Sequence, residues 1–156
     1  MRIEIDQSGK IENTNRPTVV GFSNKESGII LITPKDKKAI QKYFRGIGKP
    51  KLFIYITFVA LVFCLLKNHI KNRDQIIIDR EYPGYEKLIA KKFRELVQKK
   101  LKTEDFTVTI SQIGKKSRAH DLAWKQFHSR SHENVNKVKL ELILRIIKTN
   151  LKSGSI

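Results

Sequence analysis

The chain has 156 residues, of which 40% are hydrophobic, so it can bury a core of its own, and a disordered chain is excluded. Lys and Arg number 32 against 15 Asp and Glu, which gives a formal net charge of +17. A charge this large favours polyanionic partners, first nucleic acid and second an anionic membrane surface. A general lysine bias is the alternative, but the basic residues occur in clusters, at 35–38, 91–94, 99–102 and 115–118.

One cysteine, Cys64, lies inside an apolar run, so it cannot form an intramolecular disulfide and we expect a buried, inert thiol. No Cys/His spacing typical of a zinc site occurs. Residues 1–6 alternate apolar and charged side chains, which is not the pattern of a signal peptide. We therefore expect a cytoplasmic protein.

The first third of the chain predicts an antiparallel meander followed by a helix. Residues 2–6, 18–23 and 28–33 read as three strands with short polar connections. Thr33-Pro34 then fits a helix start, with a side-chain cap and proline at the first position, and this helix should run to about Arg45.

Residues 52–66 contain no charged side chain. As a helix they would span about 22 Å, against roughly 30 Å of hydrocarbon in a bilayer. The length and the presence of Tyr55, Thr57 and Cys64 favour a buried core helix, running to about His69. A membrane segment is the alternative.

The remainder predicts alternating strands and helices. Residues 75–79 read as a strand buried on both faces, and 106–110 as another strand. A basic amphipathic helix fits 85–101, Ser117 fits the cap of a helix to about Phe127, and a tail helix fits 135–151. We expect Trp124, Phe127 and Tyr43 to be core aromatics rather than base-stacking platforms.

This order predicts an α/β protein with a five-stranded mixed sheet: an antiparallel three-strand meander, two parallel additions, and helices on both faces. We expect a domain over 1–128, followed over 129–156 by a polar linker and an amphipathic tail helix. Two roles for the tail helix are open: it could form a homodimer, or it could pack back on the sheet.

Two strands end on an aspartate. Asp6 closes the first strand and Asp79 closes the Ile-rich strand at 75–79. If these strands are neighbours, their carboxylates converge at one edge of the sheet, where they could hold a divalent metal. The plainer alternative is that each aspartate stabilises the turn that follows it.

The order of elements and these positions resemble the ribonuclease H-like superfamily, over roughly residues 1–128, and most closely its uncharacterised archaeal-type members. The resemblance implies paired aspartates on the first and fourth strands, here Asp6 and Asp79. It also implies an acidic or histidine position near the start of the last core helix, where Ala119-His120-Asp121-Leu122-Ala123 matches.

The sequence departs from this family at one place. A glutamate normally comes from the helix before the fourth strand, and residues 52–66 contain no acidic residue. Glu81, two residues beyond Asp79, could replace it, as could Glu4 on the same strand face as Asp6.

The chemistry implied is phosphodiester hydrolysis assisted by two Mg²⁺ or Mn²⁺ ions, which take oxygen ligands. We expect Asp6 to anchor the metals, Asp79 and Glu81 to complete their ligands, and Asp121 to add one more. His120 would move protons, since its ordinary pKa lies near neutrality. Plainer alternatives are a solvated charge for Glu81, a helix-dipole role for Asp121 and a surface position for His120.

Two basic segments are candidates for contacts with nucleic acid. Gly114 ends the predicted strand shortly before a predicted helix N-terminus, and helix N-termini bind anions. Three cationic residues and one hydroxyl lie at this helix start: Lys115, Lys116, Ser117 and Arg118. Lys91 and Lys92 begin a basic helix face that could follow a phosphate backbone. No phosphate-loop spacing occurs, and we expect no small-molecule cofactor.

The sequence thus predicts a nucleic-acid-processing protein, a magnesium-dependent endonuclease or ribonuclease H-like hydrolase acting on DNA, RNA or an RNA–DNA hybrid. The alternative is a catalytically inactive nucleic-acid-binding module with the same fold. A third interpretation is a small membrane-associated protein built around residues 52–66, but the flanking amphipathic segments disfavour a membrane partner.

Overall fold

A computed structural model of the chain describes residues 1–152. Its centre is one sheet with the strand order β3-β2-β1-β4-β5. The strands are β1 (Arg2–Ser8), β2 (Thr18–Ser23), β3 (Ser27–Ile32), β4 (Asp74–Asp79) and β5 (Phe106–Ser111). The first three pair antiparallel, whereas β4 pairs parallel with both β1 and β5. The predicted mixed five-stranded sheet is therefore confirmed.

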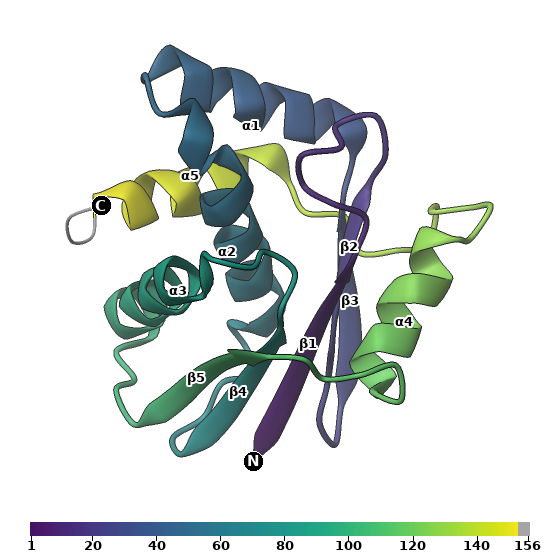
Figure 1. Cartoon of the computed structure of the whole chain (residues 1–156), viewed down its shortest axis with the longest axis vertical. Coiled ribbons are helices and arrows are strands. Elements are labelled where there is room, and N and C mark those ends of the chain that lie inside the picture. Colours follow the sequence, from purple (N-terminus) through teal and green to yellow (C-terminus); the bar gives the residue numbers. More distant parts are fainter. Residues whose placement is uncertain (153–156) are drawn as a thin grey trace.

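Helices cover both faces of this sheet (Figure 1). One face carries α4 (Arg118–Phe127), which packs on β1 and β2. The other face carries α2 (Phe53–Leu66), with α3 (Glu86–Leu101) and α5 (Leu140–Leu151) against it. The helix α1 (Pro34–Gly46) and the short 3-10 helix η1 (Pro50–Leu52) connect β3 to α2.

Residues 53–66 form the core helix that their composition predicts, although the helix ends at Leu66 and not at His69, and Leu52 belongs to η1. Almost every α2 side chain from Phe53 to Leu66 is buried, and these side chains form one cluster with apolar residues of the sheet, α3 and α5. A helix enclosed on all sides needs no polar face. Within residues 1–152, no helix combines the length and the apolar character needed to cross a membrane.

The tail helix begins later than its sequence predicts, at Leu140 rather than at 135. The preceding residues extend along the edge of β3 instead: Leu31 N donates to Asn136 O at 2.9 Å, and Val138 N donates to Leu31 O at 3.0 Å. Beyond this segment, α5 buries Ile143 and Ile147 in the core cluster shared with α2. The tail therefore packs back into the same core as residues 1–128, on helices rather than directly on the sheet.

A buried lysine fixes the turn that follows β1. Lys37 on α1 is fully buried, and its Nζ donates to the carbonyls of Lys10 at 3.1 Å and Asn13 at 2.7 Å and to Thr18 Oγ1 at 3.0 Å. Burial lowers the pKa of Lys37 from 10.5 to about 8. This ammonium donates to two loop carbonyls and to the buried Thr18 hydroxyl, so it ties the chain between β1 and β2 to α1.

Substitution Lys37→Met should lower the free energy of unfolding by about 2 kcal/mol, because two part-buried carbonyls and the buried Thr18 hydroxyl lose their charged donor. Urea denaturation of the variant measures this loss. The exposed neighbour Lys38 provides the control, since Lys38→Met should change stability by no more than about 0.5 kcal/mol. Equal stability of the two variants would contradict the role given to Lys37.

Candidate metal centre

The two strand-end aspartates lie side by side because β1 and β4 are parallel neighbours. Their register pairs Ile5 with Ile78, so Asp6 and Asp79 are the next residues of the two strands at the same sheet edge. Glu81 joins them from the loop after β4. One carboxylate oxygen of each residue lies within 4.8 Å of the other two, and no other such group of three or more His, Cys, Asp or Glu occurs in residues 1–152.

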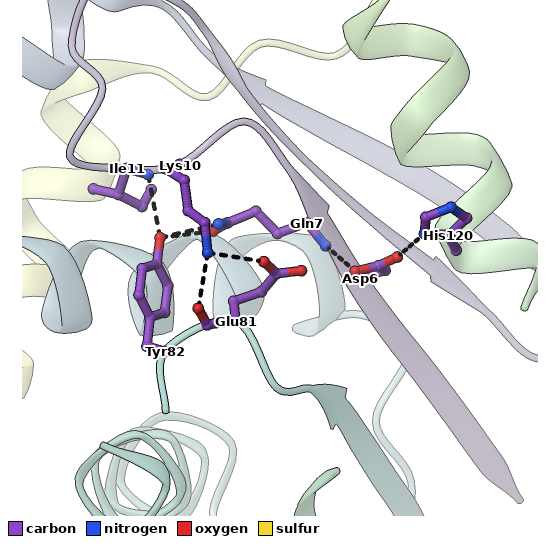
Figure 2. Close-up of polar contacts among 7 residues, drawn as sticks. All are labelled: Asp6, Gln7, Lys10, Ile11, Glu81, Tyr82 and His120. Atoms are coloured by element: carbon purple, nitrogen blue, oxygen red, sulfur yellow. Dashed lines mark hydrogen bonds and ion pairs between the residues drawn. The ribbon is translucent and has the colours of Figure 1, made fainter. Parts of the chain in front are cut away.

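Asp6 is held by contacts from two directions (Figure 2). Its side chain is 3% exposed; Oδ1 accepts from Gln7 N at 2.8 Å, and Oδ2 lies 2.6 Å from His120 Nδ1. Burial raises the pKa of Asp6, and the neighbouring charge of Asp79 raises it further, whereas the hydrogen bonds from Glu81, Gln7 and His120 oppose this shift. The Asp6 carboxylate is therefore held in one orientation, while burial and the charge of Asp79 destabilise its ionised form.

The approach of α4 to the sheet brings His120 to Asp6. Asp6 pairs with Gly21 across β1 and β2. A Cβ atom on Gly21 would lie 3.0 Å from Ala119 O, so the absence of a side chain there lets α4 pack closely. Ala119 and Ala123 face this contact and are fully buried. His120, the residue after Ala119, then reaches the end of β1.

The surroundings of Glu81 favour its protonated form. Burial, the hydrogen bond to Asp6 and the charges of Asp6 and Asp79 raise the pKa of Glu81 from 4.5 to about 8, against the opposing charge of Lys10. Lys10 Nζ donates to Glu81 O at 2.9 Å and lies 3.5 Å from Glu81 Oε2 (Figure 2). Three clustered carboxylates thus avoid full ionisation near neutral pH in the absence of a cation.

Hydrogen bonds of Asp79 and Tyr82 connect the loops around the three carboxylates. Asp79 Oδ1 accepts from Ile113 N at 3.0 Å, which ties the end of β4 to the loop after β5. Tyr82, directly after Glu81, is buried, and its hydroxyl accepts from Gln7 Nε2 at 2.9 Å and Ile11 N at 3.2 Å (Figure 2). These bonds join the loop after β4 to the loop after β1.

Asp121 and Glu4 lie outside the group. Asp121 is 54% exposed, and its Oδ2 pairs with Lys125 Nζ at 2.9 Å, one turn along α4. Glu4 pairs with Arg2 at 3.0 Å nearer the start of β1. Of the predicted metal ligands, the structure therefore gathers Asp6, Asp79 and Glu81 and leaves Asp121 at the surface.

The predicted nucleic-acid contacts divide into exposed and engaged side chains. Lys115, Lys116 and Arg118 are exposed at the start of α4, whereas the Ser117 hydroxyl is buried and accepts from Ala119 N at 3.2 Å as the helix cap. Lys91 is exposed and lies 3.9 Å from Glu95. Lys92 is fully buried, with its Nζ donating to Asn150 O at 3.1 Å, so it joins α3 to α5 and does not reach solvent.

A second basic surface, not foreseen from the sequence, lies where α3 and α5 end. We call it the basic hollow; its volume is about 530 Å³ and its lining is Lys99, Lys100, Arg145, Lys148, Thr149 and Lys152. It contains five cationic side chains and no acidic one. The lysines at 99 and 100 were recognised as basic, but their neighbours on α5 come together with them only through the packing of the two helices.

Sequence reasoning also missed Lys10, Gln7 and Tyr82. The sequence signal for this region is the turn Gln7-Ser8-Gly9-Lys10, one of the short polar connections that follow the predicted strands. Gly9 has φ +82, and a side chain there would overlap the Pro17 carbonyl and the Phe127 ring. The turn is therefore specific: it needs glycine, and it places Lys10 over the loop that contains Glu81.

The chemistry of these side chains fits a divalent cation. All three groups offer oxygen atoms, which Mg²⁺ and Mn²⁺ accept, and their spacing lets one or two ions contact all of them. A cation would displace the proton that the raised pKa of Glu81 favours and would reduce the repulsion among the carboxylates. His120 and Lys10 flank the same group without belonging to it.

Comparisons with protein-family models, with curated proteins and with solved structures find no match for this chain.

Stabilisation by Mn²⁺ should depend on pH, because the ion competes with the Glu81 proton below pH about 8. The increase in thermal midpoint caused by Mn²⁺ should therefore be small near pH 6 and larger above pH 8. Differential scanning fluorimetry across this range measures it. An Mn²⁺ effect independent of pH would contradict the raised pKa of Glu81 or its contact with the ion.

Substitution Glu81→Gln gives a second readout without metal. The folded-state pKa of Glu81 lies above its unfolded value, so ionisation removes stability as pH rises from 4.5 to about 8. Above this range the variant should be more stable than the wild type by about 1–3 kcal/mol, and near pH 4 the difference should vanish. Asp121→Asn is the control and should match the wild type.

Proposed function

We propose that this protein is a metal-dependent nuclease that hydrolyses phosphodiester bonds with Mg²⁺ or Mn²⁺. The observation that supports it most is the convergence of Asp6, Asp79 and Glu81 at the carboxyl ends of two parallel strands, in a chain of net charge +17. A phosphodiester substrate would be attracted by the positive surface and cleaved with the help of ions held by these oxygen ligands and of His120, which contacts Asp6.

We further propose that the fold is ribonuclease H-like. An antiparallel meander with two parallel strands added beside β1, and an aspartate on β1 next to one on β4, support this assignment. The departure is the source of the third carboxylate. The helix α2 contributes only apolar side chains, and Glu81 supplies the carboxylate from the loop beyond β4.

Each residue of the centre has a role under this proposal. Asp6, Asp79 and Glu81 would hold the ions, which when bound activate water and neutralise charge on the phosphate. His120 presents Nδ1 to Asp6, which leaves Nε2 to accept a proton from water or return one to the leaving oxygen. Lys10, half exposed beside Glu81, is placed to contact a phosphate oxygen once an ion occupies the carboxylates.

The exposed cations define where a nucleic acid backbone would lie. Lys115, Lys116 and Arg118 stand at the start of α4, two to five residues before His120. The basic hollow lies at the far end of α3, about 20 Å from the loop that contains Glu81 if measured along the 16-residue helix. DNA, RNA and an RNA–DNA hybrid all present phosphates to such surfaces.

The second candidate is a nucleic-acid-binding module without catalytic activity. It is favoured by the absence of an acidic residue in α2 and by the ion pair that engages Glu81 with Lys10. This candidate shares the basic surfaces but would bind nucleic acid equally well with or without an intact carboxylate group.

Cleavage assays separate the two candidates. With Mg²⁺ or Mn²⁺ and labelled single-stranded, duplex and hybrid substrates, Asp6→Asn and Asp79→Asn should reduce the cleavage rate by at least about 100-fold, since even residues behind metal ligands cost 10- to 100-fold. Asp121→Asn provides a control with the same change of chemistry outside the carboxylate group, and it should retain wild-type activity.

The proposal fails if the wild type cleaves none of these substrates, or if Asp6→Asn and Asp121→Asn cleave equally. Binding without any cleavage would favour the inactive module.

The basic hollow should contribute to affinity through counterion release. Replacing Lys100 and Arg145 together by Gln should reduce the slope of log affinity against log salt by up to about 2 for a duplex. The double variant Lys35→Gln/Lys38→Gln on α1 removes the same charge from exposed positions outside the hollow and should leave the slope nearer the wild-type value. Unchanged slopes in the hollow variant would exclude contact there.

A further inference from the structure

The exposed indole of Trp124 is the feature that the proposed function does not use. Trp124 is the single tryptophan of the chain, and the sequence pattern predicts it to be a core residue. The structure contradicts this prediction: Trp124 is 48% exposed, because α4 turns its small residues Ala119 and Ala123 to the sheet and its indole away from it.

Trp124 lies four residues after His120 on α4, and His128, four residues further along the chain, directly follows the end of the helix. Side chains spaced by four residues lie on the same helix face, about 6 Å apart along the axis. His120 Nδ1 is 2.6 Å from Asp6 Oδ2. The indole is therefore one helical turn from the side chain that touches the candidate metal centre.

The indole has a second ring beside it. The His128 ring lies 4.2 Å from the Trp124 ring, centroid to centroid, at an angle of 32°, and His128 Nδ1 lies 2.9 Å from Trp124 O. This contact favours one orientation of the exposed indole. A side chain with fewer accessible orientations loses less entropy when a planar partner stacks on it.

The charges around Trp124 favour a nucleic acid over a protein partner. Lys115, Lys116 and Arg118 are exposed at the start of the same helix. The nearest acidic residue on the exposed side, Asp121, is neutralised by Lys125 at 2.9 Å. A single strand offers both phosphates and base faces. The cations at the start of α4 would contact the phosphates, and the indole, about two turns later, would contact a base.

We propose that Trp124 stacks on an unpaired base of the nucleic acid bound at the metal centre, so that the preferred ligand is single-stranded, frayed or bulged. The inference rests on the proposed function for the location of the strand, but base stacking itself needs no cleavage. In a blunt duplex the base faces are stacked on one another, so few are open to the indole. Trp124 would therefore determine the preference for single-stranded over double-stranded nucleic acid.

Tryptophan fluorescence tests this directly, because all of it comes from position 124. Oligothymidylate titrated in EDTA should quench the emission strongly, whereas a blunt duplex of equal nucleotide content should quench it weakly. Inorganic polyphosphate, which has charge but no bases, should leave it unchanged. Anisotropy of end-labelled oligothymidylate should show affinity reduced by about 5- to 100-fold in Trp124→Ala and largely restored in Trp124→Phe.

Ile47→Ala provides the control, because Ile47 is another exposed large apolar side chain, 40% accessible, at the end of α1. It should bind as the wild type does. Oligothymidylate that binds without quenching, that fails to bind, or that binds Trp124→Ala as tightly as the wild type would overturn the proposal. Quenching in a protein without nuclease activity would support base stacking and refute the proposed catalysis, so the two failures are distinct.

Discussion

The parallel pairing of β1 with β4 is the constraint on which the rest of the structure depends. The two strands lie far apart in sequence, and α2 connects β3 to β4 across one face of the sheet. The helix α2 packs on the sheet, and α3 and α5 cover its other sides, which explains why residues 53–66 contain no charge. The pairing of β1 with β4 also puts Asp6 and Asp79 next to each other, so it positions both the core helix and the candidate centre.

Three carboxylates in one place oppose folding unless something compensates their charge. The protein supplies partial compensation: His120 and the Gln7 N–H at Asp6, the Ile113 N–H at Asp79, and Lys10 at Glu81. The remaining repulsion is reduced by protonation, because burial, the hydrogen bond to Asp6 and the nearby carboxylates raise the pKa of Glu81 to about 8. A divalent cation would reduce the repulsion that remains among the three carboxylates. Clustered carboxylates with perturbed pKa values are typical of functional sites.

Most of the sheet and the pair of aspartates could be predicted from the sequence, because alternation, the Ile-rich run and the capped helix starts are local signals. The surroundings could not be predicted in the same way. His120 faces Asp6 and Asp121 does not, because successive residues on a helix point in different directions and Ala119 with Ala123 fixes which face packs on Gly21. The sequence places Lys92 on a basic helix face, but in the structure it is buried because α5 packs over it. Trp124 is a large apolar residue on the exposed side of α4, and its exposure follows from the same rotation of the helix.

The most direct test of the central claim is anomalous diffraction from crystals soaked in Mn²⁺. The account predicts anomalous density among the carboxylates of Asp6, Asp79 and Glu81, with the Glu81 side chain released from Lys10. Crystals that bind Mn²⁺ only elsewhere, or that show no ion at these carboxylates above the pH at which Glu81 ionises, would contradict it.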